Sequence, residues 1–195
     1  MSKRQKAPAP SPSTSGADGK RTAILEAAKQ AFSRYGYART SMADVAQLAG
    51  VSRPALYEHF DNRADLYRSL AETLTEASLA AAQAAWPPDL SFREGLVAAV
   101  LAKDLELFRL VHLSPHGAEL LNNEAIDCKD LHRHLETEFA ALVTTRLGRK
   151  GAEAKAIGIM VTRAIEGLKQ GAATEEELVA SVRRLAAALS TGLDS

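Results

Sequence analysis

The sequence contains one cysteine, Cys128, one tryptophan, Trp86, and few aromatic residues, 5% in all. A single cysteine excludes a disulfide within the chain and is typical of a protein in the reducing cytoplasm. No apolar run approaches the roughly 18 residues that a transmembrane helix needs. The polar N-terminus also lacks the apolar core of a secretory signal. We therefore expect a cytoplasmic protein that does not bind a membrane.

Proline and glycine are scarce after residue 20, whereas alanine is abundant and hydrophobic residues make up 46% of the chain. Alanine has the highest helix propensity, and few helix-breaking residues interrupt the apolar pattern. A chain of 195 residues is long enough for one or two domains with a buried core. The composition predicts an all-α fold.

The net charge of zero conceals an uneven distribution of charge along the chain. Residues 1–60 hold nine Lys/Arg against four Asp/Glu, and the remainder holds fifteen against twenty. The positive charge continues into the expected folded region at Lys29, Arg34, Arg39 and Arg53. A basic first third is typical of a protein that contacts phosphates, although a basic tail beside an ordinary domain is the alternative.

Residues 1–19 are rich in Pro, Ser and Ala and have almost no large apolar side chain. They cannot bury enough surface to offset the entropy of ordering, so we predict a disordered tail. Lys3, Arg4 and Lys6 either add nonspecific DNA affinity or only make this tail more soluble.

Residues 40–60 read TSMADVAQLAGVSRPALYEHF. Thr40 and Ser41 can cap a first short helix, and Gly50 suits its C-terminus because glycine tolerates positive φ. Ser52 can cap a second helix that has proline in its first turn, where a missing N–H costs nothing. A helix, a glycine turn and a capped helix predict a helix-turn-helix, whose second helix enters the DNA major groove.

An amphipathic pattern over residues 20–35 predicts a further helix before this motif. We expect the three helices to share one core. Its predicted members are Ile24, Ala28, Ala31, Phe32, Tyr35, Val45, Leu48, Val51, Leu56 and Phe60.

Three segments of this region together resemble the DNA-binding domain of the tetracycline-repressor (TetR) family. They are AxxxFxxxGY at 28–37, TSMADVAQLAGVS at 40–52 and ALYEHFDNRADL at 55–66. Arg63 stands where a lysine is commoner in the family. The resemblance implies a bacterial homodimeric regulator, usually a repressor, that binds a palindromic double-stranded DNA operator on the nucleoid. It also implies a small molecule that shifts the protein to a conformation that releases DNA.

The motif and the resemblance assign eight candidate DNA-binding residues: Thr40, Ser41, Arg53, Pro54, Ala55, Tyr57, His59 and Arg63. Arg53 opens the recognition helix, where it can bond either a guanine or a phosphate. Ser41 and Thr40 at one helix N-terminus, and Arg63 at the next, are expected to hold phosphates. Tyr57 serves either DNA or the core.

We expect a DNA-binding domain at 20–66 and a ligand-binding and dimerisation domain at 67–195, with about nine helices in the whole chain. Further helices are predicted at 63–85, from Asp89 or Ser91 through Phe108, over PHGAELLNN, at 124–147, at 152–170, and from Thr174 onward.

The candidate ligand-binding residues are Trp86, Phe92, Phe108, His112 and His116. Trp86 can instead close the core. The pairs His112/His116 and Cys128/His132 each have helical spacing and could offer two metal ligands. Because Pro115 interrupts the first pair and spacing provides no third ligand, we predict no metal site and no cofactor.

The last two helices are the predicted homodimer interface. One carries a strip of small residues that permits close helix approach, and the other a row of apolar residues close to a coiled-coil seam. The strip is Ala154, Gly158 and Thr162, and the row is Leu178, Val182, Leu185 and Leu189. Both helices could instead complete the core of one subunit. We favour the dimer because one recognition helix reads too few bases alone.

Other function classes leave little trace in the sequence. We find no P-loop, no GxGxxG after a strand, no HExxH and no GxSxG, so we predict that the chain is not an enzyme. An architectural DNA binder without a ligand and a module used only for protein contacts remain as alternatives.

Overall fold

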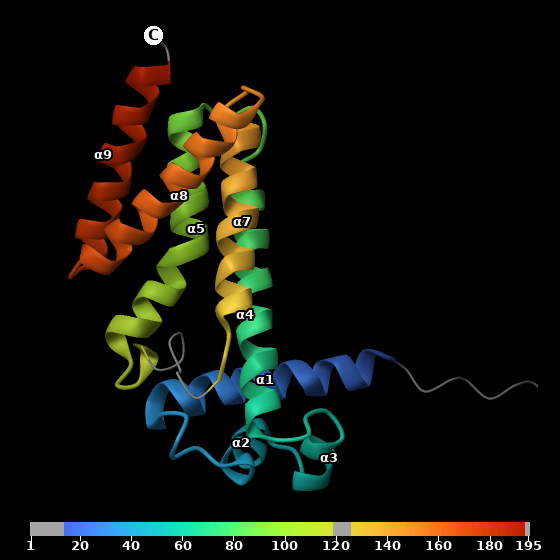
Figure 1. Cartoon of the computed structure of the whole chain (residues 1–195). Coiled ribbons are helices and arrows are strands. Elements are labelled where there is room, and N and C mark those ends of the chain that lie inside the picture. The colour runs from blue at the N-terminus through green and yellow to red at the C-terminus, as the bar shows by residue number, and fades with distance from the viewer. Residues whose placement is uncertain (1–13, 119–125, 194–195) are drawn as a thin grey trace, which may run out of the picture.

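The computed structural model describes residues 14–118 and 126–193, and these form eight helices and no strand (Figure 1). The expected all-α fold is confirmed. The helices are α1 Thr14–Tyr35, α2 Met42–Ala49, α3 Arg53–Tyr57, α4 Arg63–Ala85, α5 Phe92–Leu113, α7 Lys129–Arg146, α8 Ala152–Gly171 and α9 Glu175–Leu193. The short helix predicted after Ser114 falls mostly on residues outside the described ranges.

Helices α1 to α3 and the first turns of α4 form a small head around one apolar core. Helix α1 begins at Thr14, so the prediction of disorder is wrong for residues 14–19, and residues 1–13 lie outside the described ranges. Once an amphipathic helix is anchored, each further residue adds a backbone hydrogen bond without a new nucleation cost. This favours extension of α1 into a segment that would not fold alone.

Two predicted members of the head core, Tyr35 and Leu48, are instead exposed. Helix α2 has only eight residues and turns Met42, Val45 and Ala46 inward, which leaves Leu48 on the outer side with 51% of its surface exposed. Tyr35 ends α1 and points outward. The aromatic residue that joins the core is Tyr37, whose ring centre lies 5.7 Å from that of Phe32.

Helix α4 connects the head to the body formed by α5, α7, α8 and α9 (Figure 1). It packs against α5 and α7, while α9 covers α5 and α8 covers α7. Its bounds agree with the predicted 63–85. The body has a second apolar core, which includes Trp86, Leu96, Phe139, Val161 and Leu178.

Trp86 closes this core at the turn between α4 and α5. Its indole is fully buried and lies directly on the backbone of Gly95, where an added Cβ would come within 1.8 Å of Nε1. Phe92 packs against the same indole, ring edge to face, at 5.4 Å between centres. Glycine is required at position 95 because any side chain would occupy the space of the indole.

Helices α7 and α8 approach closely where the strip of small residues lies. A Cβ at Gly158 would sit 2.2 Å from Thr144 Oγ1 and 2.6 Å from the carbonyl oxygen of Ala140. Ala154, Gly158 and Thr162 are all buried. The predicted close approach is therefore real and lies within one chain, between α7 and α8.

Helix α7 begins at Lys129, five residues later than predicted. The Asp127 carboxylate accepts a hydrogen bond from the Lys129 N–H at 3.1 Å, and the Asp127 carbonyl accepts one from Arg68 of α4 at 3.0 Å. These contacts fix Asp127 just before the first turn of the helix. Helix α9 begins as predicted, since Thr174 Oγ1 accepts a bond from the Glu177 N–H at 3.2 Å.

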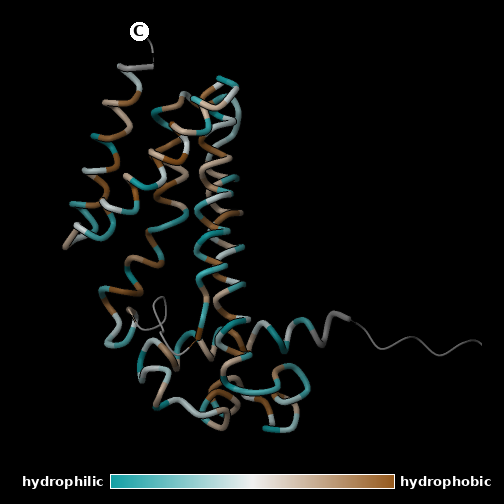
Figure 2. Tube along the Cα trace, in the orientation of Figure 1, coloured by the Kyte–Doolittle hydropathy of each residue, from teal (hydrophilic) through white to brown (hydrophobic). Residues whose placement is uncertain are grey.

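Hydrophobic and hydrophilic residues alternate along the helices, so none is apolar on all sides (Figure 2). Across the described residues, no helix combines the length and the apolar character needed to cross a membrane.

Candidate functional site

The helix-turn-helix is built by local hydrogen bonds that the sequence predicted. Ser41 Oγ accepts from the Asp44 N–H at 3.2 Å, and the Asp44 carboxylate accepts from the Ser41 N–H at 2.8 Å. The Ser41 hydroxyl, and then its N–H, lower the pKa of Asp44. Gly50 ends α2 with a φ of 67°, in the left-handed region. Ser52 then caps α3 through the Ala55 N–H at 3.3 Å.

Helix α3 presents one face to solvent and is anchored by the other. Leu56 is buried within α3, and Phe60 is buried just beyond it. Arg53, Pro54 and Tyr57 are exposed, and Ala55 and His59 are partly exposed. Since α2 and α3 lie at the end of the molecule farthest from the body, this face is open to a large partner (Figure 1). The predicted recognition residues are thus brought together.

Thr40 does not share this exposed position. Its hydroxyl donates to the carbonyls of Gly36 at 2.8 Å and Ala31 at 3.3 Å, and only 1% of the residue is exposed. Its side chain therefore does not cap α2, contrary to the prediction. Ser41 alone is the cap and is exposed. Thr40 instead joins the end of α1 to the start of α2.

Arg63 is engaged within the head rather than extended toward solvent. Its Nη1 donates to the carbonyls of Thr40 at 2.9 Å and Ala38 at 3.1 Å, and its guanidinium lies 4.2 Å from the centre of the Tyr37 ring. These contacts hold the α1–α2 connection against the start of α4. Arg63 therefore positions the helix-turn-helix relative to α4, and this role does not depend on a phosphate contact.

Some of the basic residues that suggested phosphate contact have partners inside the protein. Lys29 forms an ion pair with Glu106 of α5 and so ties the head to the body. The Arg21 guanidinium lies 5.3 Å from the centre of the Phe60 ring. Arg39 and Arg53 are exposed on the head.

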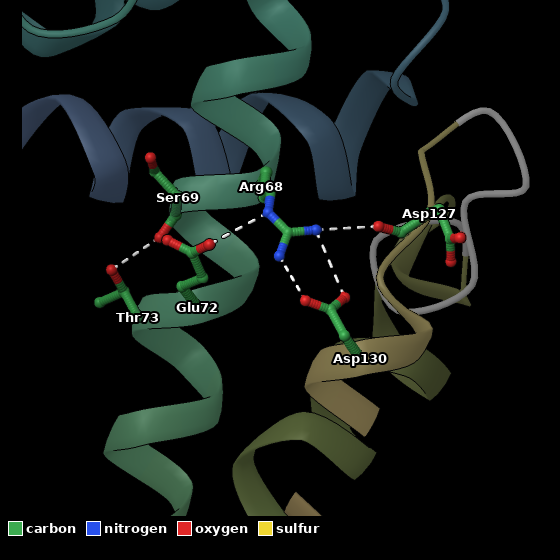
Figure 3. Close-up of polar contacts among 6 residues, drawn as sticks. All are labelled: Arg68, Ser69, Glu72, Thr73, Asp127 and Asp130. Carbon is green, nitrogen blue, oxygen red and sulfur yellow. Dashed lines mark hydrogen bonds and ion pairs between the residues drawn. The ribbon is translucent and has the colours of Figure 1, made fainter. Parts of the chain in front are cut away.

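Arg68 joins α4 to the beginning of α7 (Figure 3). Its guanidinium binds both carboxylate oxygens of Asp130, at 3.3 and 2.5 Å, donates to the Asp127 carbonyl and pairs with Glu72 at 3.1 Å. The hydrogen bond between Arg68 and Asp130 raises the pKa of Arg68 and lowers that of Asp130. Sequence reasoning missed this link because its members lie far apart in the chain, as the separation of 62 between Arg68 and Asp130 shows.

A cavity of about 580 Å³ lies among α4, α5, α7 and α8. This volume falls in the range of about 300–1,000 Å³ that is usual for sites of small organic ligands. Its apolar wall consists of Tyr67, Ala71, Leu74, Leu107, Phe108, Val111, Leu131 and Leu135. Its polar residues are Thr75, Ser78, Asp104, His112, Cys128, His132, Glu136, Glu166, Lys169 and Gln170.

Two of the five predicted ligand residues line this cavity. Phe108 and His112 do so with their rings stacked at 3.9 Å, and His112 Nδ1 lies 2.9 Å from the Phe108 carbonyl oxygen. Trp86 and Phe92 belong to the body core and do not line this cavity. His116 lies outside the cavity lining, near α1, where its N–H donates to the Ser33 carbonyl at 3.0 Å.

Charged residues next to the cavity form a cluster that sequence reasoning missed. Asp104, only 1% exposed, accepts the ammonium groups of Lys103 at 2.7 Å and Lys169 at 3.1 Å on one oxygen. Lys169 also pairs with Glu166 at 2.8 Å. A signal was present, because Val100, Asp104 and Phe108 follow one another at helical spacing and place a carboxylate on an apolar stripe.

The two lysines of this cluster respond differently to burial. Burial lowers the pKa of Lys103, and the neighbouring Asp104 carboxylate only partly offsets it. Burial also acts to lower the pKa of Lys169, but Asp104 and Glu166 outweigh it and the net pKa is raised. Lys169 is therefore held as a cation between two carboxylates.

The cavity also brings together three of the four residues considered as metal ligands, His112, Cys128 and His132. Among the residues that the structure describes, no group of three such side chains is arranged to hold a metal ion. Burial raises the pKa of the Cys128 thiol, which disfavours the thiolate that metals bind.

Comparison with known proteins identifies the head. Residues 24–70 match the family model described as bacterial regulatory proteins, tetR family. The HTH-type transcriptional regulator TtgR of Pseudomonas putida is 52% identical over 56 residues, which are 29% of this chain and 27% of TtgR. The HTH-type transcriptional activator FasR of Mycolicibacterium smegmatis is 33% identical over 85 residues, 44% of this chain and 39% of FasR.

These sequence matches span well under half the length of either relative. A crystal structure of a tetR-family transcriptional regulator from Streptomyces coelicolor covers 91% of this chain and 86% of its own, with a TM-score of 0.67 at 15% identity. It shows that the body, too, has the fold found in such regulators. Residues 24–70 therefore match the tetR family of bacterial regulatory proteins, and the chain as a whole shares its fold with a solved regulator of that family.

Proposed function

We propose that the protein is a cytoplasmic homodimeric repressor that binds a palindromic operator through α3 and releases it when a small molecule occupies the cavity. The observation that carries this proposal is that α4 belongs to the head and to the cavity wall at once. Leu66 and Leu70 are buried in the head core, while Leu74 and Ser78 of the same helix line the cavity. Tyr67 does both.

This arrangement supports a coupling between ligand and DNA. A ligand that presses on Leu74 or Tyr67 acts on a helix whose first turns hold the recognition unit through Arg63. The bridge from Arg68 to Asp130 joins the same helix to α7, which also lines the cavity. Ligand and DNA need only favour different positions of α4 for each to weaken the binding of the other.

Helices α8 and α9 are the proposed dimer interface. Ile159 and Met160 of α8 expose 45% and 55% of their surfaces, although both are large apolar residues. In α9, Leu178 and Val182 are buried inside the subunit while Leu185 and Leu189 are only partly covered. Apolar surface of this kind is usual at an interface between copies of one chain.

Selection of duplex DNA from a random pool by the full-length protein tests operator recognition. We expect enrichment of a two-fold symmetric sequence with two half-sites. Arg53→Ala should then weaken binding at least several-fold, because a specific base contact is worth about 1–3 kcal/mol. Arg93→Ala, at an exposed arginine of α5 in the body, is the matched control and should bind as the wild type does.

Three results would contradict this proposal in different ways. Protection of DNA without sequence preference would indicate an architectural binder. No salt-sensitive affinity for any duplex would indicate a module for protein contacts. Equal affinity of the Arg53→Ala variant and the wild type would remove that residue from the interface.

The dimer is tested separately by sedimentation equilibrium. Ile159→Glu places a charge on the exposed surface of α8 and should shift the protein toward a monomer. Leu113→Glu changes an equally large apolar residue, the exposed last residue of α5, and should leave the dimer intact. A wild-type protein that stays monomeric at micromolar concentration would refute the proposed interface.

A further inference from the structure

The carboxylate of Asp104 has one oxygen that lacks a partner. Oδ1 accepts from both Lys103 and Lys169, whereas Oδ2 is buried and has no hydrogen bond from any group in the described part of the chain. A buried acceptor left without a donor is unfavourable, most of all on an ionised group. Because Asp104 is one of the residues lining the cavity, a ligand is the natural source of the missing donor.

The charged residues around the cavity favour a positively charged donor group on the ligand. The cavity lining contains three carboxylates, those of Asp104, Glu136 and Glu166, and one ammonium group, that of Lys169. Even with Lys103 included, which pairs with Asp104 but does not line the cavity, there are three carboxylates and two lysines. Lys169 is already shared by two carboxylates and Lys103 is bound to one, so an anionic ligand would find mainly like charges. A cation would find an excess of carboxylate.

The rest of the wall restricts the remainder of the ligand. Leu74, Leu107 and Leu135 reach the cavity from three different helices, and the stacked rings of Phe108 and His112 form one side. Apolar side chains on several sides favour an apolar body, and the volume of about 580 Å³ accommodates a molecule of drug size.

We propose that the cavity binds an amphipathic organic cation, an apolar molecule with a protonated primary or secondary amine whose N–H donates to Asp104 Oδ2. This inference rests on the proposed function only in taking the cavity as the effector site. Both the positive charge and the N–H are required, since the charge meets the excess carboxylate and the N–H satisfies the buried oxygen.

Four matched probes test the proposal on the full-length wild-type protein in the absence of DNA, by calorimetry or ligand-observed NMR. 4-Phenylbutylammonium has charge and donor, 4-phenylbutanol has a donor without charge, trimethyl(4-phenylbutyl)ammonium has charge without a donor, and 5-phenylpentanoate is an anion. We expect the first to bind at least about tenfold more tightly than each of the others, with the anion weakest. Equal binding of the amine and the alcohol, or tighter binding of the anion, overturns the proposal.

A substitution tests whether Asp104 is the source of the preference for the amine. Asp104→Asn keeps the shape and removes the charge, so the ratio of amine to alcohol affinity should fall to about one. Glu153→Gln removes an exposed carboxylate of α8 outside the cavity and should preserve the ratio. If Asp104→Asn fails to fold, the ratios measured on the wild type still decide. A ratio unchanged by Asp104→Asn in a folded protein overturns the assignment to Asp104.

Adding the selected operator separates this inference from the proposed function. If the amine is preferred but does not release DNA, the ligand class stands and the regulatory role of the cavity fails. If DNA is bound specifically and no probe is preferred, the ligand class fails and the DNA-binding function stands.

Discussion

Replacing Gly95 with alanine should disturb the corner where α4 meets α5. The new Cβ would lie 1.8 Å from Nε1, 1.9 Å from Cδ1 and 2.5 Å from Cε2 of Trp86. Ordinary contacts of such atoms are about 3.5–4.0 Å, so the indole must move by more than an ångström. It has no free space to enter, since it is fully buried and packed against Phe92.

The expected cost combines two opposing effects. Overpacking of a core costs about 1–3 kcal/mol of stability, and the loss of the packing of a buried aromatic side chain costs up to about 3–5 kcal/mol. The higher helix propensity of alanine stabilises the helix by about 1 kcal/mol. We expect a net loss of about 2–4 kcal/mol in the free energy of unfolding. In a chain of this size, each kcal/mol lost lowers the melting temperature by about 2–4 °C.

Circular dichroism during chemical unfolding measures this loss at one fixed protein concentration. Gly19→Ala is the matched control, because nothing lies within 4 Å of a Cβ at that position of α1. It should leave stability unchanged or raise it by at most about 1 kcal/mol. The double variant Gly95→Ala/Trp86→Leu should lose less free energy of unfolding than the two single variants lose together, because both substitutions act on the same contact.

A second readout comes from the indole itself. Trp86 is the one tryptophan of the sequence, so the emission of the folded protein reports on this corner alone. We expect Gly95→Ala to shift it toward the wavelength of an exposed indole. A variant as stable as the wild type, with the same emission maximum, would refute the reasoning about the close contact.

Three further changes test other contacts. Gly158→Ala places a Cβ 2.2 Å from Thr144 Oγ1 and should destabilise the chain by about 1–3 kcal/mol in urea unfolding; no loss would show that α7 and α8 can separate freely. Ser41→Ala removes the cap of α2 and should cost about 0.5–2 kcal/mol by the same assay, and a neutral result would contradict the capping role. Asp130→Asn removes the ion pair with Arg68. Because the pair lowers the pKa of Asp130, its stabilisation is present above the ordinary value of 3.8 and is lost as the pH falls through the folded-state value. The variant should thus be less stable than the wild type at pH 7, whereas the two should converge in strong acid.

The parts of the fold set by short-range chemistry could be predicted from the sequence. The cap at Ser52, the left-handed Gly50 and the ends of α4 depend on residues within a few positions of one another. The close approach at Gly158 was also predictable, because small residues at helical spacing have few other uses. Its partner was not, since the same strip suits an interface between two chains.

The errors came from contacts between distant residues. Helix α7 begins just after the hydrogen bond from Arg68 to the Asp127 carbonyl, a long-range contact that no local pattern predicts. Thr40 has the residue type of a cap, yet its hydroxyl donates to the carbonyls of Gly36 and Ala31. No prediction was made for Asp104, and its partner Lys169 comes from a distant part of the chain. The exposed positions of Arg53, Pro54 and Tyr57 could thus be predicted, whereas the cluster of Asp104, Glu166 and Lys169 could not.

Tyr67 belongs both to the head core and to the cavity lining, and this limits how the ligand preference of the protein can change. Its ring packs on Phe32 and Tyr37 in the head, at 5.6 and 5.4 Å between centres, while the same residue borders the cavity. A substitution there that reshaped the cavity would also loosen the DNA-reading unit. Altered ligand preference, whether by natural divergence or by protein engineering, should therefore be reached through the walls that α5 and α7 provide.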